Sequence, residues 1–227
     1  MNIYLLLIPS ILIFDYLIST IVRIFNLRGL ESTLPNEFKD IVDMDNFVKS
    51  QNYTRVNTNF EYITSTFSLL LSILLIFSGF YNTVDKFVIA LGFNYILTGT
   101  LFFIVLILIT DILATPFSLY KTFIIEEKFG FNKTNFSTFI IDKLKGYFIL
   151  SLLGIPLLAI ILYFFNKFPI YAWFYTWVLV SLFSILIQPI FNLFIAPLFN
   201  KFTPLPNGLL LKQIQEYLKK VNFPVKK

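Results

Sequence analysis

The stretch FVIALGFNYILTGTLFFIVLILITDIL, residues 87–113, decides the fold of this chain. Asp111 is its only charged residue, and about 20 predominantly apolar residues suffice for a helix to cross a bilayer. The sequence therefore predicts an all-α, polytopic membrane protein with about five transmembrane helices. The other four apolar runs are Ile3–Phe25, Ile63–Phe80, Tyr147–Phe165 and Ile170–Ile195.

Composition agrees with a membrane protein and argues against a nucleic-acid partner. Hydrophobic residues make up 57% of the 227 residues and charged residues 14%, whereas a soluble domain is about 25% charged. The mean hydropathy is +0.77. The net charge of +5 does not indicate nucleic-acid binding, because the Lys and Arg residues lie in loops between apolar runs. The expected partner is the lipid bilayer.

The distribution of basic residues predicts an orientation. Of the 18 Lys and Arg residues, only Lys86 and Lys167 fall outside the first loop, the third loop and the C-terminal tail. Five spans place those three segments on one side, and positive loops are typically cytoplasmic. We therefore expect an N-terminus that is outside or lumenal and a cytoplasmic tail, in a bacterial plasma membrane or the endoplasmic reticulum. The first apolar run lacks a basic region and a cleavage site, so we interpret it as a retained anchor.

The segments on the basic side contain amphipathic patterns. A short surface helix is expected over Leu34–Ser50, opened by Pro35, because its apolar residues follow helical spacing. Ile124–Lys145 mixes charges with phenylalanines, which suggests a folded or interfacial segment. The tail from Asn207 predicts an amphipathic helix that ends before Pro224.

Proline positions suggest where the spans are interrupted. We expect the third span to end before Pro116, and Pro156 to kink the fourth. At the end of the fifth span, Gln188, Pro189 and Asn192 form a polar, helix-breaking patch. Such patches are tolerated where they line water or are buried in protein.

Two carboxylates within the spans are candidate functional residues. Asp15 lies in the middle of the first span, where a carboxylate is costly and usually faces a partner or a water-filled cavity. It either lines a polar pathway or pairs with another helix. Asp111, close to Thr110 and Thr115, either caps the third span or closes its membrane end.

Glu126 and Glu127 are adjacent, so on a helix they point in different directions and form a poor acid–base pair. Residues 121–128 are therefore also consistent with a solvated loop held by ion pairs.

The chain lacks the residues that hold zinc in most proteins. It contains no His and no Cys, so neither an HExxH helix nor a Cys–His zinc site can form. We accordingly expect no catalytic residue, no metal ligand and no cofactor within these 227 residues.

Two blocks of sequence resemble the type I CAAX prenyl protease family. The first is PFSLYKTFIIEEKFGFN, residues 116–132, and the second is IAPLFNKFTPLP, residues 195–206, which is followed by a Leu/Lys helix and NFPVKK, residues 222–227. The resemblance covers nearly the whole chain. It implies a multi-span zinc endopeptidase that encloses a water-filled chamber and cuts prenylated CAAX proteins.

The resemblance also implies how the chain is organised. In that family the HExxH helix and a glutamate ligand lie downstream of the block that matches residues 222–227. Residues 1–206 would be the N-terminal membrane domain and residues 207–227 the start of a truncated catalytic domain. Asp15, Asp111 and the loop Glu126–Asn132 would line or seal the chamber, and Glu126, Glu127 and Asn132 would brace the protease domain or its substrate groove. Asn192–Pro206 would lead into the catalytic domain.

Several interpretations remain open from the sequence. In the complete family enzyme the cofactor would be zinc, and the partners would be the C-terminal catalytic half and a protein or peptide substrate. The chain is either a piece of such an enzyme, inactive alone, or a protein that has lost the catalytic half and acts as a membrane scaffold. A small transporter or a lipid-binding membrane protein is the alternative from another functional class.

Overall fold

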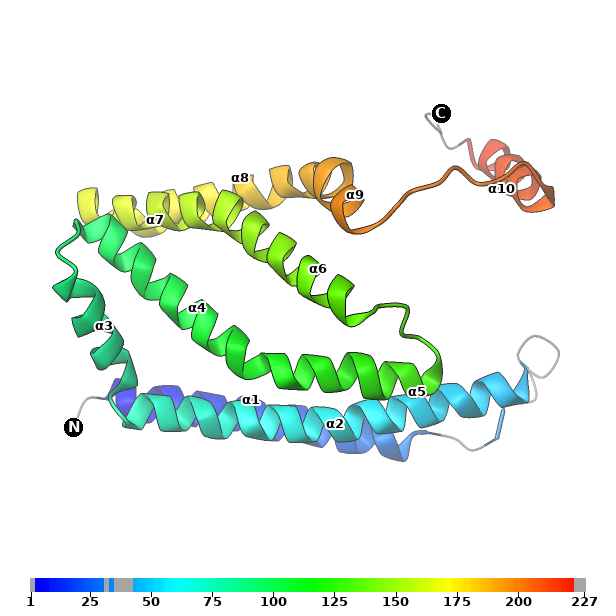
Figure 1. Ribbon diagram of the computed structural model, residues 1–227, viewed down its shortest axis with the longest axis horizontal. Helices are drawn as coiled ribbons and strands as arrows, with labels where there is room; N and C mark the ends of the chain where they lie inside the picture. The colour runs from blue at the N-terminus through cyan, green and yellow to red at the C-terminus, as the bar shows by residue number, and fades with distance from the viewer. Residues whose placement is uncertain (1–2, 31–32, 35–42, 223–227) are drawn as a thin grey trace. The chain divides into compact units, whose positions relative to one another are not determined.

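In the computed structural model, every regular element of the described residues is a helix. The structure describes residues 3–30, 33–34 and 43–222. The chain divides into two compact units, residues 1–169 and 170–227 (Figure 1). Each unit is described by itself below.

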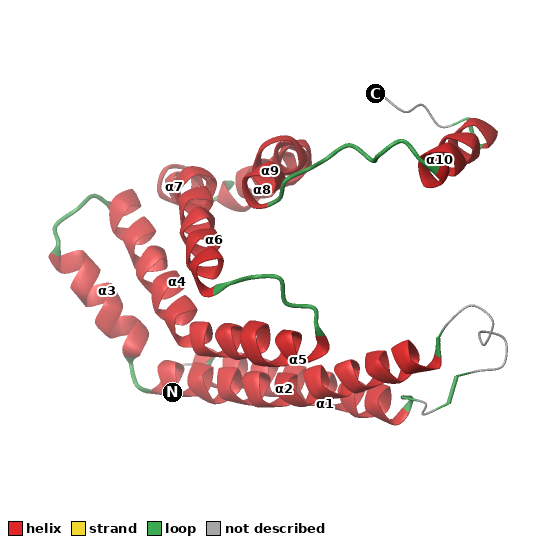
Figure 2. Ribbon diagram, turned by 45° about the vertical axis from the view of Figure 1, so that its right-hand side comes forward, coloured by secondary structure: helices red, strands yellow, loops and turns green. Residues whose placement is uncertain are grey.

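The first two helices of unit 1 lie side by side (Figures 1 and 2). Helix α1 covers Tyr4–Arg28, and α2 covers Met44–Phe77. Polar contacts join them within the apolar region, where the hydroxyls of Tyr16 and Thr66 lie 2.8 Å apart. In hydrocarbon a hydrogen bond between helices satisfies polar groups that have no water available.

Helix α2 is a single helix of 34 residues, so the predicted separation of a surface helix at Leu34–Ser50 from a span at Ile63–Phe80 is wrong. The side chain of Asp43 caps it by accepting from the backbone N–H of Asn46. No Gly or Pro interrupts Met44–Phe77, so nothing in the chain forces a break between the polar and the apolar half. Pro35 and residues up to 42 lie outside the described residues.

The third span begins and ends later than the sequence suggested. Residues Phe80–Ala90 form a separate short helix, α3. Gly92 follows with a φ of 73°, and the chain turns there before the next helix begins. Helix α4 covers Tyr95–Tyr120 and continues through a π-helical segment, Lys121–Glu126, into α5, Glu127–Phe129. Both predicted limits, Phe87 and Leu113, are therefore wrong.

Helix α4 continues through Pro116, where a stop was expected. A proline removes one backbone donor, and Ser or Thr side chains commonly satisfy neighbouring carbonyls in membrane helices. Here the Thr115 hydroxyl donates to the Asp111 carbonyl at 2.7 Å, and the Ser118 hydroxyl donates to the Ala114 carbonyl at 3.3 Å.

The fourth span is also longer than predicted. Helices α6, Phe136–Ile149, and α7, Ile155–Lys167, are joined by a π-helical turn at Leu150–Gly154, immediately before Pro156. Residues 124–145, expected to be a folded or interfacial segment, are the end of one long helix, a short connection and the start of the next. Helix α7 packs closely on α4 at Gly99, where an added Cβ would lie 2.9 Å from Leu162 Cδ1.

Unit 2 contains the fifth span and the predicted amphipathic tail helix. Helix α8 covers Ala172–Ile190, a π-helical segment covers Phe191–Ile195, and α9 covers Ala196–Phe199. After residues 200–208, which have no helix, α10 covers Leu209–Lys220. The amphipathic tail helix is confirmed, while Pro224 lies outside the described residues.

Five helical segments of the described chain are long and apolar enough to cross a membrane, as predicted. They are Tyr4–Arg28, Met44–Phe77, Tyr95–Phe129, Phe136–Lys167 and Ala172–Phe199. In the most apolar stretch of each span, at most 6% of the residues are buried. Large apolar surfaces of this kind suit lipid or further protein rather than water.

The cap of α4 gives a test of this fold. The Asn94 side chain accepts a hydrogen bond from the Leu97 N–H at 3.0 Å. We expect Asn94→Ala to lower the free energy of unfolding by about 1 kcal/mol, because a helix donor loses its partner. Reversible unfolding in mixed micelles measures it. Asn82→Ala, inside α3, is the matched control and should lower the free energy of unfolding by less. An equal decrease for both variants would contradict the role of Asn94 as a cap.

Candidate functional site: a polar groove and two anchoring clusters

One face of α2 carries a stripe of polar side chains through its membrane-spanning part. Because residues three and four apart share a face of a helix, these side chains lie along one line. The stripe consists of Glu61, Thr64, Ser65, Ser68 and Ser72. An apolar helix with such a stripe has one side suited to water or to polar partners.

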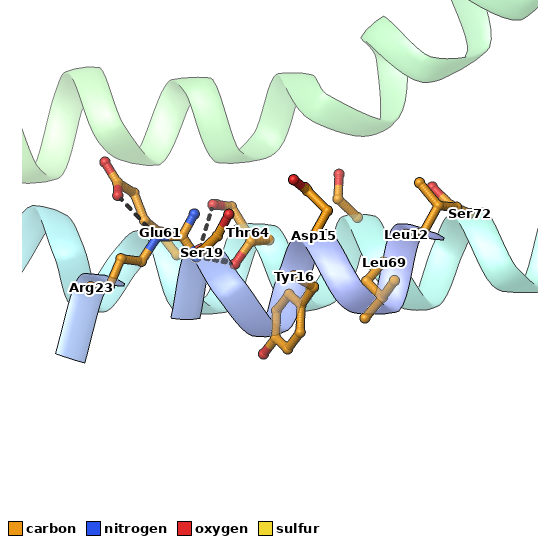
Figure 3. Close-up of a pocket in the computed structure, with 11 residues that line it drawn as sticks. Leu12, Asp15, Tyr16, Ser19, Arg23, Glu61, Thr64, Leu69 and Ser72 are labelled. Carbon is orange, nitrogen blue, oxygen red and sulfur yellow. Dashed lines mark hydrogen bonds and ion pairs between the residues drawn. The ribbon is translucent and has the colours of Figure 1, made fainter. Parts of the chain in front are cut away.

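The stripe faces α1 across a groove of about 370 Å³ (Figure 3). Helix α1 contributes Asp15, Tyr16, Ser19 and Arg23 to its lining. In Figure 3, Asp15 and Glu61 point to the same side, toward α4. The structure thus places Asp15 in a polar groove, which is one of the two environments expected for it. Among the ion pairs of the described residues, none involves Asp15.

Arg23 closes one end of this groove. Its Nε lies 3.5 Å from Glu61 Oε2, and its Nη1 donates to Ser65 Oγ at 2.9 Å. The guanidinium also lies 5.8 Å from the centre of the Tyr62 ring, within the range of a cation–π interaction. Glu61 is thus paired with a cation, and Asp15 is the other carboxyl side chain that lines the groove.

The same stripe borders a second groove, of about 350 Å³, against α4. Glu61, Thr64, Ser68 and Ser72 line both grooves. Helix α4 adds Thr110 and Ser118 to the second groove, and Lys121 follows at its end. The three helices therefore present a connected polar surface within their spans, which is suited to hold water or an extended polar chain.

A cluster of charges connects α4 to α6. Lys143 Nζ lies 2.9 Å from Asp111 Oδ2. The Tyr147 hydroxyl also donates to Asp111, and Lys143 donates to the Thr115 hydroxyl. Asp111 was expected to cap the end of its helix, but it lies within α4, which continues to Tyr120. The sequence indicated a role for Asp111 but not its partner, because no local spacing connects residues 111 and 143.

Glu126, Glu127 and Asn132 come together in one tight turn. Asn132 Nδ2 donates to Glu127 Oε2 at 2.8 Å, and the backbone N–H of Phe131 donates to the Glu126 carbonyl at 2.9 Å. Gly130, with a φ of 73°, supplies the left-handed conformation that this turn needs. The two carboxylates serve different partners, as expected for adjacent residues on a helix.

Helix α2 holds this turn in place. Tyr53 donates to Glu126 Oε1 at 3.3 Å, and its ring packs edge-on against Phe129 and Phe131, at centroid distances of 5.2 and 4.8 Å. Lys49 Nζ lies 5.6 Å from the centre of the Phe131 ring. Sequence reasoning did not identify Tyr53 or Lys49 as partners of the turn, since they precede it by more than seventy residues.

Asn192 lies in unit 2, within the π-helical segment after α8, and it is exposed. The helix break expected there is wrong, because the helix continues through Pro189 and the π-helical segment to Phe199. The role expected for Asn192 in leading toward a further domain stays a prediction.

The residues of this chain do not fit a zinc site. Within the part of the chain that the structure describes, no three His, Cys, Asp or Glu side chains gather closely enough to hold a metal ion. The sequence also has no His or Cys. The polar grooves and clusters of the described residues instead offer solvation and charge pairing.

The fold and its polar intramembrane surface define a polytopic helical membrane protein. The family model described as "CAAX prenyl protease N-terminal, five membrane helices" matches residues 23–201. The chain belongs to this family, and the resemblance noted from the sequence is confirmed.

Full-length relatives agree with this assignment. The chain is 32% identical over 220 residues to CAAX prenyl protease 1 homolog of Arabidopsis thaliana, covering 93% of this chain and 52% of that protein. It is 35% identical over 200 residues to probable CAAX prenyl protease 1 of Schizosaccharomyces pombe, covering 82% and 42%. The chain thus spans about half the length of these relatives.

A solved structure shows the same fold. The crystal structure of Ste24p of S. mikatae matches with a TM-score of 0.86 and 30% sequence identity, over 99% of this chain and 53% of that one. All five helical spans therefore have counterparts within about half of that chain.

The interhelical charge cluster can be tested with a double-mutant cycle. Lys143→Met alone leaves Asp111 without its cation. We expect it to lower the free energy of unfolding by about 1–3 kcal/mol, which is between the cost of removing an exposed ion pair and that of breaking a buried one. Asp111→Asn combined with Lys143→Met should recover at least half of that loss. Unfolding in mixed micelles gives the coupling energy. Additive single and double losses would show that the pair does not join α4 to α6.

Proposed function

We propose that this chain is the chamber-forming N-terminal membrane domain of a zinc metalloendopeptidase of the CAAX prenyl protease type. The observation that carries the proposal is the match of 99% of the chain to about half of the Ste24p structure. The relatives that share its sequence are named CAAX prenyl proteases. The substrate class is then a prenylated CAAX protein or another membrane-associated protein.

The zinc site belongs to a different segment in this proposal. Hydrolysis of this type needs two His on one helix face, a third ligand, and a Glu that activates the water. This chain has no His. A C-terminal catalytic half is therefore the required partner, and the 227 residues alone are inactive. Residues 1–206 provide the membrane domain, and residues 207–227 begin the catalytic one.

The polar surface on α1, α2 and α4 gives the membrane domain its role. A peptide that is to be hydrolysed carries backbone groups that need hydrogen-bond partners, and hydrocarbon offers none. Asp15, together with the hydroxyls of Ser68 and Ser72, keeps water and a polar peptide solvated at the depth of the membrane. The turn at Glu126–Asn132, fixed by Tyr53, braces the catalytic half.

Reconstitution of the missing half tests this proposal. We expect no cleavage of a farnesylated CAAX peptide by the purified chain. Cleavage should appear when the chain is joined to the C-terminal half of a related protease, and a zinc chelator should abolish it. The control is the same fusion with the HExxH glutamate replaced by Gln, which removes the general base. Chelator-insensitive cleavage by the chain alone would overturn the proposal.

The second part of the proposal is an orientation with the basic loops in the cytoplasm. Because the sequence has no Cys, single-cysteine variants can be labelled without background. In sealed bacterial cells that carry the chain in their plasma membrane, an impermeant maleimide should label Asn82→Cys and should reach Lys133→Cys only after permeabilisation. The two residues lie in α3 and in the turn before α6, on opposite sides of the predicted topology. The reverse labelling pattern would contradict the positive-inside assignment.

A further inference from the structure

One exposed segment of unit 2 carries a pair of residues with its own chemistry. Residues 200–208 connect α9 to α10 without a helix (Figure 2). The last two of them, Asn207 and Gly208, form the only Asn–Gly pair in the sequence. Asparagine is among the chemically labile residues of proteins, and its lifetime depends on the residue that follows it. This pair is therefore a candidate site of covalent modification.

An asparagine loses its side-chain amide when the next backbone nitrogen attacks it. The Gly208 nitrogen gives up its proton and forms a bond to Cγ of Asn207, the bond from Cγ to Nδ2 breaks, and the nitrogen leaves as ammonia. Water then opens the cyclic imide at either of its two carbonyls. The products are aspartate and isoaspartate, in which the main chain runs through the side-chain carbon. Water is the only other reactant.

Glycine at position 208 makes this attack easy. It places no side chain beside the attacking nitrogen, and it explores a wider range of backbone conformations than other residues. Asn200 lies in the same segment, but it is followed by Lys201, whose side chain shields the nitrogen. Ring closure should therefore be faster at Asn207 than at Asn200.

The structure leaves both residues of the pair free to react. Asn207 and Gly208 are exposed. Among the hydrogen bonds of the described residues, none is made by the Asn207 side chain or by the Gly208 N–H. The Gly208 carbonyl accepts from the Lys212 N–H at 3.2 Å, but the Gly208 nitrogen precedes the hydrogen-bonded part of α10. Ring closure thus has to break no hydrogen bond.

Several other asparagines are held by the fold. The side chains of Asn94 and Asn135 each accept a hydrogen bond as helix caps. The Asn132 amide donates to Glu127 and accepts from the backbone N–H of Thr134. A side chain held in this way must give up these bonds before it can turn toward the next nitrogen. The fold therefore adds to the selectivity that the sequence provides.

Loss of the Asn207 amide would change the start of α10. This helix has no acidic residue in its first turn, and Gly208 offers no side-chain cap. The free N–H groups at a helix N-terminus carry partial positive charge, which a nearby carboxylate stabilises. A carboxylate at position 207 would also lower the net charge of +5 by one.

We propose that Asn207 is a site of spontaneous deamidation, and that its conversion to aspartate or isoaspartate adds a negative charge at the start of α10. The reactants are the chain's own Asn207–Gly208 pair and water. The site does not depend on the proposed protease function, because no catalytic half takes part in the reaction.

Peptide mapping of the unaltered chain tests the site. The purified protein is incubated in mildly alkaline buffer, digested with trypsin and analysed by mass spectrometry. Cleavage after Lys201 and Lys212 gives the peptide 202–212, whose only side-chain amide is that of Asn207. We expect this amide to be lost about tenfold faster than that of Asn200, which corresponds to a barrier lower by about 1.4 kcal/mol. Equal rates at the two positions would overturn the proposal.

Gly208→Ala tests whether the glycine is responsible. A Cβ added at position 208 would come no closer than 3.9 Å to the Pro206 carbonyl oxygen, so the variant fits the fold. Amide loss at Asn207 should slow about tenfold, because the methyl group hinders the attacking nitrogen. Gly146→Ala, in α6, is the matched control, since a Cβ there meets nothing within 4 Å, and it should leave the rate unchanged. The same rate of amide loss in both variants would contradict the proposal.

Discussion

The absence of water inside a bilayer is the constraint on which this structure depends. Polar groups in the spans bond to their own helix, to another helix or to water, and the bonds between helices hold particular helices together as neighbours. Asp111 finds Lys143 and Tyr147, Tyr16 finds Thr66, and Arg23 finds Glu61. These contacts join α4 to α6 and α1 to α2. Apolar packing alone gives little direction in lipid, because lipid tails are as apolar as leucine.

The same constraint separates two kinds of surface. Helix α2 places Thr64, Ser68 and Ser72 on one face, where they line both polar grooves. The Thr64 hydroxyl donates to the Glu61 carbonyl of its own helix at 3.2 Å, and the face as a whole suits water or a polar chain. Helices α4 and α6 instead expose Ile112 and Phe148, which suit acyl chains. A membrane domain with both surfaces can keep a hydrated interior within a hydrophobic exterior. The proposed role as the membrane domain of a protease requires that combination.

Much of the fold could be predicted from the sequence, because its signal is local. About twenty predominantly apolar residues identify a span wherever they occur, and all five spans were predicted in this way. The helix Leu209–Lys220 was predicted from its amphipathic pattern instead. Helix limits were less predictable. Helix α4 continues through Pro116, since one proline removes a single backbone donor and a membrane helix tolerates that loss, and Asn94 caps its beginning within the apolar run.

The candidate site was only partly predictable for the same physical reason. Asp15 and Asp111 were identified because a carboxylate in a span is costly wherever it lies. Their surroundings depend on which helices are neighbours, which no spacing within one helix encodes. Lys143 and Tyr53 were therefore missed as partners. The roles of Glu126, Glu127, Asn132 and Asn192 in supporting a catalytic half stay predictions.

The central claim is that this chain provides the membrane half of a protease whose zinc ligands lie elsewhere. The most direct measurement is to sequence the coding DNA beyond the codon for Lys227, in all three frames. The account predicts an HExxH motif and a later glutamate in helical context, which would supply the ligands and the general base that this half lacks. A downstream sequence without them would contradict the claim for this locus, and the chain would then be a membrane scaffold.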